Sequence, residues 1–288
     1  MSDITAYAAP RSLDEAVSLL QAGDVTILAG GTDLTPQTKS GKLTFRPTLM
    51  NIRRVPELSG LTESGGVMRI GALTTISSLL ASPLIHERFN GLWQACDHFA
   101  SDQIRNAATI GGNICNASPA GDTLTPLLTL DARVVLASKP NGSIVRRTTP
   151  LGEFLTGPGR TARQPAELLE AIEIPMPPEG FFSAFFKFGT RPALDISVIS
   201  IAIGAVRDGR KLTRVRIAFG AVAPTAIRAA ATEAALEGRP IDAAAIDAAV
   251  AAAVNETKPV SDVRASSWYR RELVGNMLRR MLDHVANS

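Results

Sequence analysis

Two short glycine-rich segments are the clearest candidates for chemistry in this sequence. "AGGTDL" occupies residues 29–34, and "TIGGN" occupies residues 109–113, about eighty residues further on. Adjacent glycines remove two Cβ atoms where the backbone turns, so main-chain N–H groups can approach an anion closely. Because each segment follows an apolar, strand-like stretch, the pair predicts two loops that hold the two ends of one diphosphate.

Polar side chains accompany both segments. Thr32, Thr109 and Asn113 can donate hydrogen bonds to phosphate oxygens, while Asp33 or Asp122 can accept hydrogen bonds from ribose hydroxyls or a ring N–H. Neither segment matches G-x-G-x-x-G or the P-loop pattern, so neither a Rossmann domain nor an ATPase is indicated. One Gly-Gly pair alone is typical of a tight turn. The occurrence of two pairs favours a nucleotide-binding site.

No other group of residues indicates catalysis or metal binding by this chain. Ser118 has no neighbouring histidine, and the nucleophile elbow G-x-S-x-G does not occur. Cys115 is interpreted as a small packing residue rather than a reactive thiol. The two cysteines and three histidines lack the spacing of metal ligands. We therefore predict neither a catalytic residue nor a metal site.

Composition and charge narrow the class of protein. The composition, 45% hydrophobic and 20% charged, is typical of a folded protein. The length of 288 residues favours two domains. No apolar run is long enough to span a bilayer, and the N-terminus has no basic start followed by an apolar core. The net charge of +3 is spread along the chain, without a basic stripe. We expect a cytoplasmic protein with no membrane span and no nucleic-acid partner.

The elements around the glycines must position them. Ser12 can cap a helix that ends at Gly23, and a β-branched strand follows over residues 25–28. The first glycine segment comes next, and Pro36 then allows a short helix. The stretch 109–122, by contrast, is expected to form neither a helix nor a strand.

The second half of the sequence predicts a smaller mixed domain. A strand is expected over residues 168–174, and the proline-rich cluster 175–180 is the best candidate for a domain boundary. Antiparallel strands are expected around a turn at residues 208–209, followed by helices over residues 226–254 and 268–285. The predicted fold class is α+β.

Five segments, in their order and spacing, resemble the FAD-binding subunit of the molybdenum hydroxylases, a family that includes xanthine dehydrogenase and aerobic carbon monoxide dehydrogenase. The segments are "ILAGGTDLTPQTKSG", "QIRNAATIGGNICNASPAGDTLTPLLTLDARV", "FLTGPGRTARQPAELLEAIEIP", "KFGTRPALDISVISIAI" and "SDVRASSWYRRELVGNML". The resemblance implies a PCMH-type (vanillyl-alcohol-oxidase-like) FAD-binding domain over residues 1–176, with subdomains of about 1–56 and 57–176. A smaller C-terminal α+β domain over residues 177–288 would follow.

The resemblance also implies which residues contact FAD. One subdomain would hold the diphosphate through Ala29, Gly30, Gly31, Thr32 and Asp33, and the other through Thr109, Ile110, Gly111, Gly112 and Asn113. Asp122 falls where the family has a flavin-contacting aspartate, Phe99 where an aromatic lies near the adenine, and Leu169 and Lys187 where residues line the flavin. For Phe99 and Leu169 the alternative is a core position, and for Lys187 a solvated surface position.

The implied function is electron transfer inside a larger complex. Partner subunits would hold molybdopterin and two [2Fe-2S] clusters, because this chain lacks the cysteines and the length for either. The FAD of this chain would pass electrons to NAD or another acceptor. Two alternatives stay open: a self-sufficient FAD-dependent oxidase, and a non-catalytic nucleotide-binding scaffold.

Overall fold

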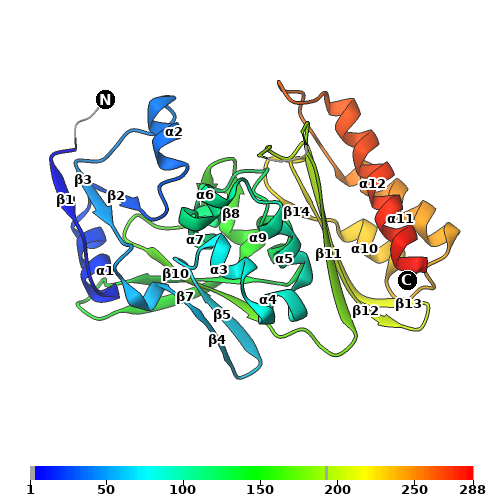
Figure 1. Cartoon of the computed structure of the whole chain (residues 1–288), viewed down its shortest axis with the longest axis horizontal. Coiled ribbons are helices and arrows are strands. Elements are labelled where there is room, and N and C mark those ends of the chain that lie inside the picture. Colours follow the sequence, from blue (N-terminus) through cyan, green and yellow to red (C-terminus); the bar gives the residue numbers. More distant parts are fainter. Residues whose placement is uncertain (1–3, 192–193, 288) are drawn as a thin grey trace.

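The computed structural model of the chain describes residues 4–191 and 194–287 and places them in three parts that follow one another in space (Figure 1). Each part has its own sheet; the central and C-terminal parts each have a large hydrophobic core, and a third core is shared by the N-terminal and central parts. Within the two described ranges, no helix is long and apolar enough to cross a membrane.

The N-terminal part contains a parallel three-stranded sheet in the order β1-β3-β2. Its elements are β1 (Ala6–Ala8), α1 (Leu13–Ala22), β2 (Val25–Leu28), α2 (Leu34–Lys39) and β3 (Thr48–Asn51). As predicted, the Ser12 hydroxyl caps α1 by accepting a hydrogen bond from the Glu15 N–H at 3.2 Å. The apolar stripe of α1 packs against the central part, so this part lies firmly beside it.

The central part is built on an antiparallel five-stranded sheet in the order β4-β5-β10-β6-β7. Its strands are β4 (Leu61–Ser64), β5 (Val67–Gly71), β6 (Arg133–Ser138), β7 (Val145–Pro150) and β10 (Leu168–Pro175), with a separate pair β8 (Leu155–Gly157) and β9 (Arg160–Thr161). Its helices are η1 (Pro56–Leu58), α3 (Ile76–Leu80), α4 (Pro83–Arg88), α5 (Asn90–Asp97), α6 (Asp102–Ala107), α7 (Ile110–Asn116), α8 (Leu124–Thr129) and α9 (Leu151–Phe154).

The C-terminal part is an antiparallel sheet in the order β11-β12-β13-β14, between two groups of helices (Figure 1). Helices α5 and α8 of the central part cover one face, and α10 to α12 cover the other. The elements are β11 (Phe181–Phe188), β12 (Ile199–Asp208), β13 (Lys211–Gly220), β14 (Ile227–Arg228), α10 (Ala230–Leu236), α11 (Ala243–Glu256) and α12 (Ser267–Asn287). The predicted α+β class is confirmed, and the expected turn between two antiparallel strands is present at Gly209 and Arg210, one residue later than predicted.

Two expectations about local structure are wrong. Residues 110–116 form helix α7, and the segment before them is helix α6 rather than a strand, so "TIGGN" opens a helix instead of forming a loop. The single helix expected over residues 226–254 is interrupted. Gly238, with φ +70°, and Pro240 separate α10 from α11, because neither residue suits a helix interior.

Candidate cofactor-binding site

A cleft of about 1310 Å³ runs between the N-terminal and central parts, and the C-terminal part contributes Asp195 and Ile196 to its lining. It contains both glycine segments. Of the fourteen residues predicted to bind the cofactor, all but Ile110 and Lys187 line this cleft. The fold therefore brings together two segments that lie far apart in the sequence.

The first wall is the loop that leaves β2. Gly31 has φ +75°, which favours glycine, and a Cβ atom on Gly30 would lie 2.2 Å from the Ala107 carbonyl oxygen. Among the described residues, the N–H groups of Gly31, Thr32 and Asp33 have no hydrogen-bond partner. Three consecutive free donors beside a cleft are suited to an anion such as a diphosphate.

The second wall is the first turn of α7, and it differs from the first wall in a way the sequence did not predict. The Thr109 hydroxyl caps the helix by accepting the Gly112 N–H at 3.0 Å. The N–H of Ile110 donates to the Thr74 carbonyl oxygen, and that of Gly111 to the Ala72 carbonyl oxygen. These three main-chain donors of the second segment are therefore already bonded within the protein, and the segment offers the cleft mainly side chains.

Asn113 is the clearest of those side chains. Its Oδ1 accepts a hydrogen bond of 2.7 Å from the Thr123 hydroxyl, which fixes the amide and identifies its Nδ2 as the donor left for a ligand. Ile110, in contrast, is fully buried in the central core. Its side chain serves packing and lies outside the lining of the cleft.

Gln37 links the two walls, and sequence reasoning missed it. Its Nε2 donates to Asp33 Oδ2 at 2.5 Å and to Asn116 Oδ1 at 2.6 Å. Gln37 lies on α2 and Asn116 on α7, so the contact joins the N-terminal part to the central part. No local pattern marks Gln37, because its role depends on a partner 79 positions away.

Asp122 lines the cleft with both carboxylate oxygens engaged. Lys187 Nζ lies 2.7 Å from Oδ2, and the Ser197 hydroxyl donates to Oδ1 at 2.7 Å. Burial raises the pKa of Asp122, whereas the contacts with Lys187 and Ser197 act in the opposite direction. Lys187 is therefore not a solvated surface lysine: its side chain is 8% exposed and also donates to the His98 carbonyl oxygen.

Further lining residues come from β9, from the stretch after it and from the start of β10. Thr161, Arg163 and Leu168 line the cleft together with the predicted Leu169, which is almost fully buried. The Arg163 side chain donates to the Glu167 carbonyl oxygen at 2.7 Å. Leu168 opens the strand expected over residues 168–174, but no pattern in the sequence marks it, Thr161 or Arg163 as a residue that lines a cleft.

Cys115 and Phe99 also line the cleft. Burial raises the pKa of the Cys115 thiol to about 11, which agrees with a packing residue rather than a nucleophile. Phe99 is half-buried, packs against the central core and still reaches the cleft.

The site fits an extended dinucleotide. The cleft volume exceeds that of typical small-ligand pockets. Free main-chain donors on one wall suit a diphosphate, and apolar groups such as Phe99 and Leu169 suit flat rings. The fold and the site together define a dinucleotide-binding protein with an additional α+β domain.

Comparison with known families agrees with this class. Residues 2–177 match the family described as the FAD binding domain in molybdopterin dehydrogenase, and residues 184–285 match the CO dehydrogenase flavoprotein C-terminal domain. The xanthine dehydrogenase FAD-binding subunit of Escherichia coli O157:H7 is 34% identical over 99% of this chain and 97% of its own. The carbon monoxide dehydrogenase medium chain of Hydrogenophaga pseudoflava is 34% identical over 96% of this chain and 95% of its own.

Solved structures show the same fold. The carbon monoxide dehydrogenase of Hydrogenophaga pseudoflava matches with a TM-score of 0.91 and 34% identity, over 97% of this chain and 96% of that chain. Quinoline 2-oxidoreductase of Pseudomonas putida 86 matches with a TM-score of 0.90 and 27% identity, over 99% and 98% of the two chains. The chain belongs to the family of FAD-binding medium subunits of xanthine and carbon monoxide dehydrogenase-type molybdenum hydroxylases. The fold and cofactor predicted from sequence are thereby confirmed.

Proposed function

We propose that this chain carries FAD as the electron-transfer subunit of a hetero-oligomeric molybdenum hydroxylase. Electrons would pass from [2Fe-2S] clusters of a small subunit, through the flavin, to NAD or another acceptor, while a large subunit holds molybdopterin. The observation that carries the proposal is one cleft lined by both glycine segments, in a chain that matches FAD-binding subunits over nearly its full length. A cytoplasmic location is part of the same proposal, and fractionation of cells that express the tagged chain tests it.

We propose the following division of roles within the chain. The domain bounds are those expected from the sequence, 1–176 and 177–288, and the junction between them lies in the connection from β10 to β11. The loop at Gly31 to Asp33 holds the diphosphate, and Asn113 donates to it from the opposite wall. Asp122 contacts the flavin end of the cofactor. When bound, FAD supplies the redox chemistry, and the protein orients it and excludes water from one side.

Of the two alternatives, a self-sufficient oxidase is the less supported. Such an enzyme needs a base beside its substrate, and the described residues that line the cleft include neither a histidine nor a tyrosine. A non-catalytic nucleotide-binding scaffold would use the same free donors, and reduction of the flavin within the complex distinguishes an electron-transfer subunit from it. Electron transfer between partners needs only an oriented cofactor, which is what these residues can provide.

The test uses the complex and the isolated chain side by side. We expect the purified chain to be yellow and to release FAD on denaturation. In the complex with its molybdopterin and [2Fe-2S] subunits, stopped-flow absorbance should show flavin bleaching after substrate is added. Omitting the [2Fe-2S] subunit should abolish the bleaching without removing FAD. Clusters that are reduced while the flavin of the full complex stays oxidised would contradict the proposal.

A further inference from the structure

One exposed arginine, which does not line the cleft, binds two carbonyl groups of the first glycine loop. Arg53 Nε donates to the Ala29 carbonyl oxygen at 2.8 Å, and Arg53 Nη2 donates to the Gly30 carbonyl oxygen at 2.9 Å. The two hydrogen bonds use two nitrogens of one planar guanidinium, and this rigid geometry fixes the relative position of the two acceptors.

The fold places Arg53 there. Strands β2 and β3 are parallel neighbours, with Leu28 paired to Asn51, so the residues that follow each strand lie side by side. The Ile52 N–H donates to the Leu28 carbonyl oxygen at 3.1 Å, which continues this pairing into the loop. The Arg53 N–H donates to Asn51 Oδ1 at 3.1 Å, which fixes the main chain from which the arginine side chain extends.

The orientation of two peptide groups follows from these contacts. In a trans peptide the C=O and N–H bonds point in opposite directions, and the described chain has no cis peptide. With the carbonyls of Ala29 and Gly30 turned toward Arg53, the N–H groups of Gly30 and Gly31 must point away from it. Gly30 and Gly31 line the cleft, so these donors are directed to that side of the loop.

The loop also lies close to the backbone of the central part. A Cβ atom on Gly30 would lie 2.2 Å from the Ala107 carbonyl oxygen and 3.0 Å from the Ala108 Cα, so the loop lies directly against the backbone of the central part. The loop is thus in contact with both the Arg53 guanidinium and the backbone of residues 107–108.

We infer that Arg53 is a positioning residue for diphosphate binding, which it serves by fixing the peptide planes of residues 29–31 from outside the cleft. This inference rests on the proposed binding of FAD at the cleft. The positive charge also lies behind peptide groups whose positive ends face the ligand, so its field favours an anion there.

Arg54 provides a matched control. It is the next residue and is also exposed, and no hydrogen bond or ion pair is found for it among the described residues. The variants are Arg53→Met, which keeps the aliphatic stem, Arg53→Lys, which cannot reach both carbonyls with a planar fork, and Arg54→Met.

The experiment measures ligand binding to the apo chain by fluorescence and calorimetric titration with FAD, ADP and riboflavin. We expect Arg53→Met to weaken FAD and ADP by about tenfold or more, the scale of losing hydrogen bonds from a charged group, and to leave riboflavin nearly unchanged. Arg53→Lys should fall between, and Arg54→Met should bind all three ligands as the parent chain does. Equal losses for FAD and riboflavin, or no loss for FAD, would overturn the inference.

NMR spectra of the apo chain give a readout that needs no ligand. Arg53→Met should shift or broaden the amide resonances of Gly30 and Gly31, whose peptide planes are no longer fixed, and leave those of α12 unchanged. If the parent chain binds no FAD, the proposed function fails, while the NMR result still decides whether Arg53 holds the loop. Unchanged resonances of Gly30 and Gly31 would overturn the role of Arg53 even where FAD binds normally.

Discussion

Both oxygens of the Asp122 carboxylate are engaged by groups from the C-terminal part before any ligand is considered. The Lys187 ammonium and the Ser197 hydroxyl each lie 2.7 Å from it, and the lysine side chain is 8% exposed. A buried pair of this kind is costly to break from one side only, because the remaining charge loses its partner in a place from which water is largely excluded. Lys187 therefore sets the position of Asp122.

A double-mutant cycle tests this coupling. Lys187→Met and Asp122→Asn should each destabilise the apo chain by about 3 kcal/mol, since each single change leaves one buried polar partner unpaired. The double variant should be less destabilised than the sum of the two. Urea unfolding followed by circular dichroism measures all four proteins. Strictly additive losses would show that the two side chains do not depend on each other.

Cys115 lines the cleft, yet it should be a poor nucleophile. Because burial raises the pKa of its thiol to about 11, only about one thiol in a thousand is ionised at pH 8, against roughly a quarter for a free cysteine. Alkylation by iodoacetamide at Cys115 should be slow at pH 8 and accelerate as the pH rises toward 11. Mass spectrometry of the labelled peptide measures it, and rapid labelling at pH 8 would contradict the packing role.

At the level of elements, local signals predicted α1, β2, the first glycine loop and α2 in the right order. Each carries its own signal: a Ser12 cap, a β-branched run, a Gly-Gly pair and Pro36. Helix α7 was missed because two glycines lower intrinsic helix propensity, and a tertiary contact overrides that preference. Strand β7 was missed because it is an exposed edge strand without apolar alternation.

The contact that overrides helix propensity in α7 is a close approach to the end of β5. A Cβ atom on Gly111 would lie 2.7 Å from both the Cβ and the carbonyl oxygen of Ala72. A glycine is therefore required here for packing between two elements of the central part, in addition to any role beside a ligand. Tertiary contacts also explain why the sequence predicted only part of the site. The contacts of Gln37, Asp122 and Arg53 join segments that are distant in the sequence, so the sequence alone could not reveal them.

Gly111→Ala should consequently affect folding as well as cofactor binding. The added methyl group forces α7 away from Ala72, with an expected loss of about 1–3 kcal/mol in the free energy of unfolding and a lower FAD content after purification. Urea unfolding and the ratio of flavin to protein absorbance measure the two effects.

Gly275→Ala is the control, because it makes the same glycine-to-alanine change in a different helix. Gly275 lies in α12, and its added Cβ would meet Val254 Cγ2 at an ordinary 3.4 Å. This variant should keep its FAD and gain up to about 1 kcal/mol from improved helix propensity. A Gly111→Ala protein with parental stability and FAD content would show that α7 tolerates a side chain at this position.

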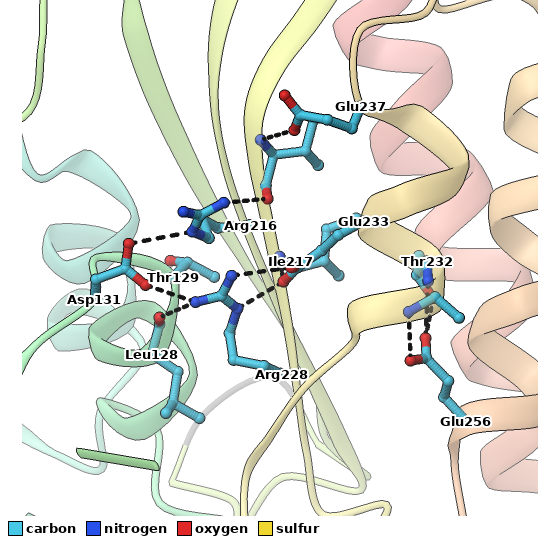
Figure 2. Close-up of polar contacts among 12 residues, drawn as sticks. Leu128, Thr129, Asp131, Arg216, Ile217, Arg228, Thr232, Glu233, Glu237 and Glu256 are labelled. Carbon is cyan, nitrogen blue, oxygen red and sulfur yellow. Dashed lines mark hydrogen bonds and ion pairs between the residues drawn. The ribbon is translucent and has the colours of Figure 1, made fainter. Parts of the chain in front are cut away.

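At the level of the whole molecule, the C-terminal part completes the cleft, so its attachment to the rest of the chain matters for the site. The attachment includes a polar network that joins α8 to β13, β14 and α10 (Figure 2). Asp131, two residues after the end of α8, accepts hydrogen bonds from Arg228 at 2.7 Å and from Arg216 at 3.1 Å. Arg228 also contacts the Leu128 carbonyl oxygen and Glu233, so one guanidinium spans both parts.

Arg228→Met should loosen the C-terminal part without unfolding it. The change removes the contacts to Asp131 and Leu128 and leaves Glu233 without its cationic partner, at a cost of about 2 kcal/mol. Because β11 to β14 and α10 to α12 retain their own core, we expect thermal unfolding to separate into two transitions and limited proteolysis to speed up in residues 176–180. Arg279→Met is the matched control, since Arg279 pairs with an exposed Asp247 within the C-terminal part and its loss should cost less than about 1 kcal/mol. A single, parental transition for Arg228→Met, with unchanged proteolysis, would mean that apolar packing of α5 and α8 on the sheet holds the two parts together by itself.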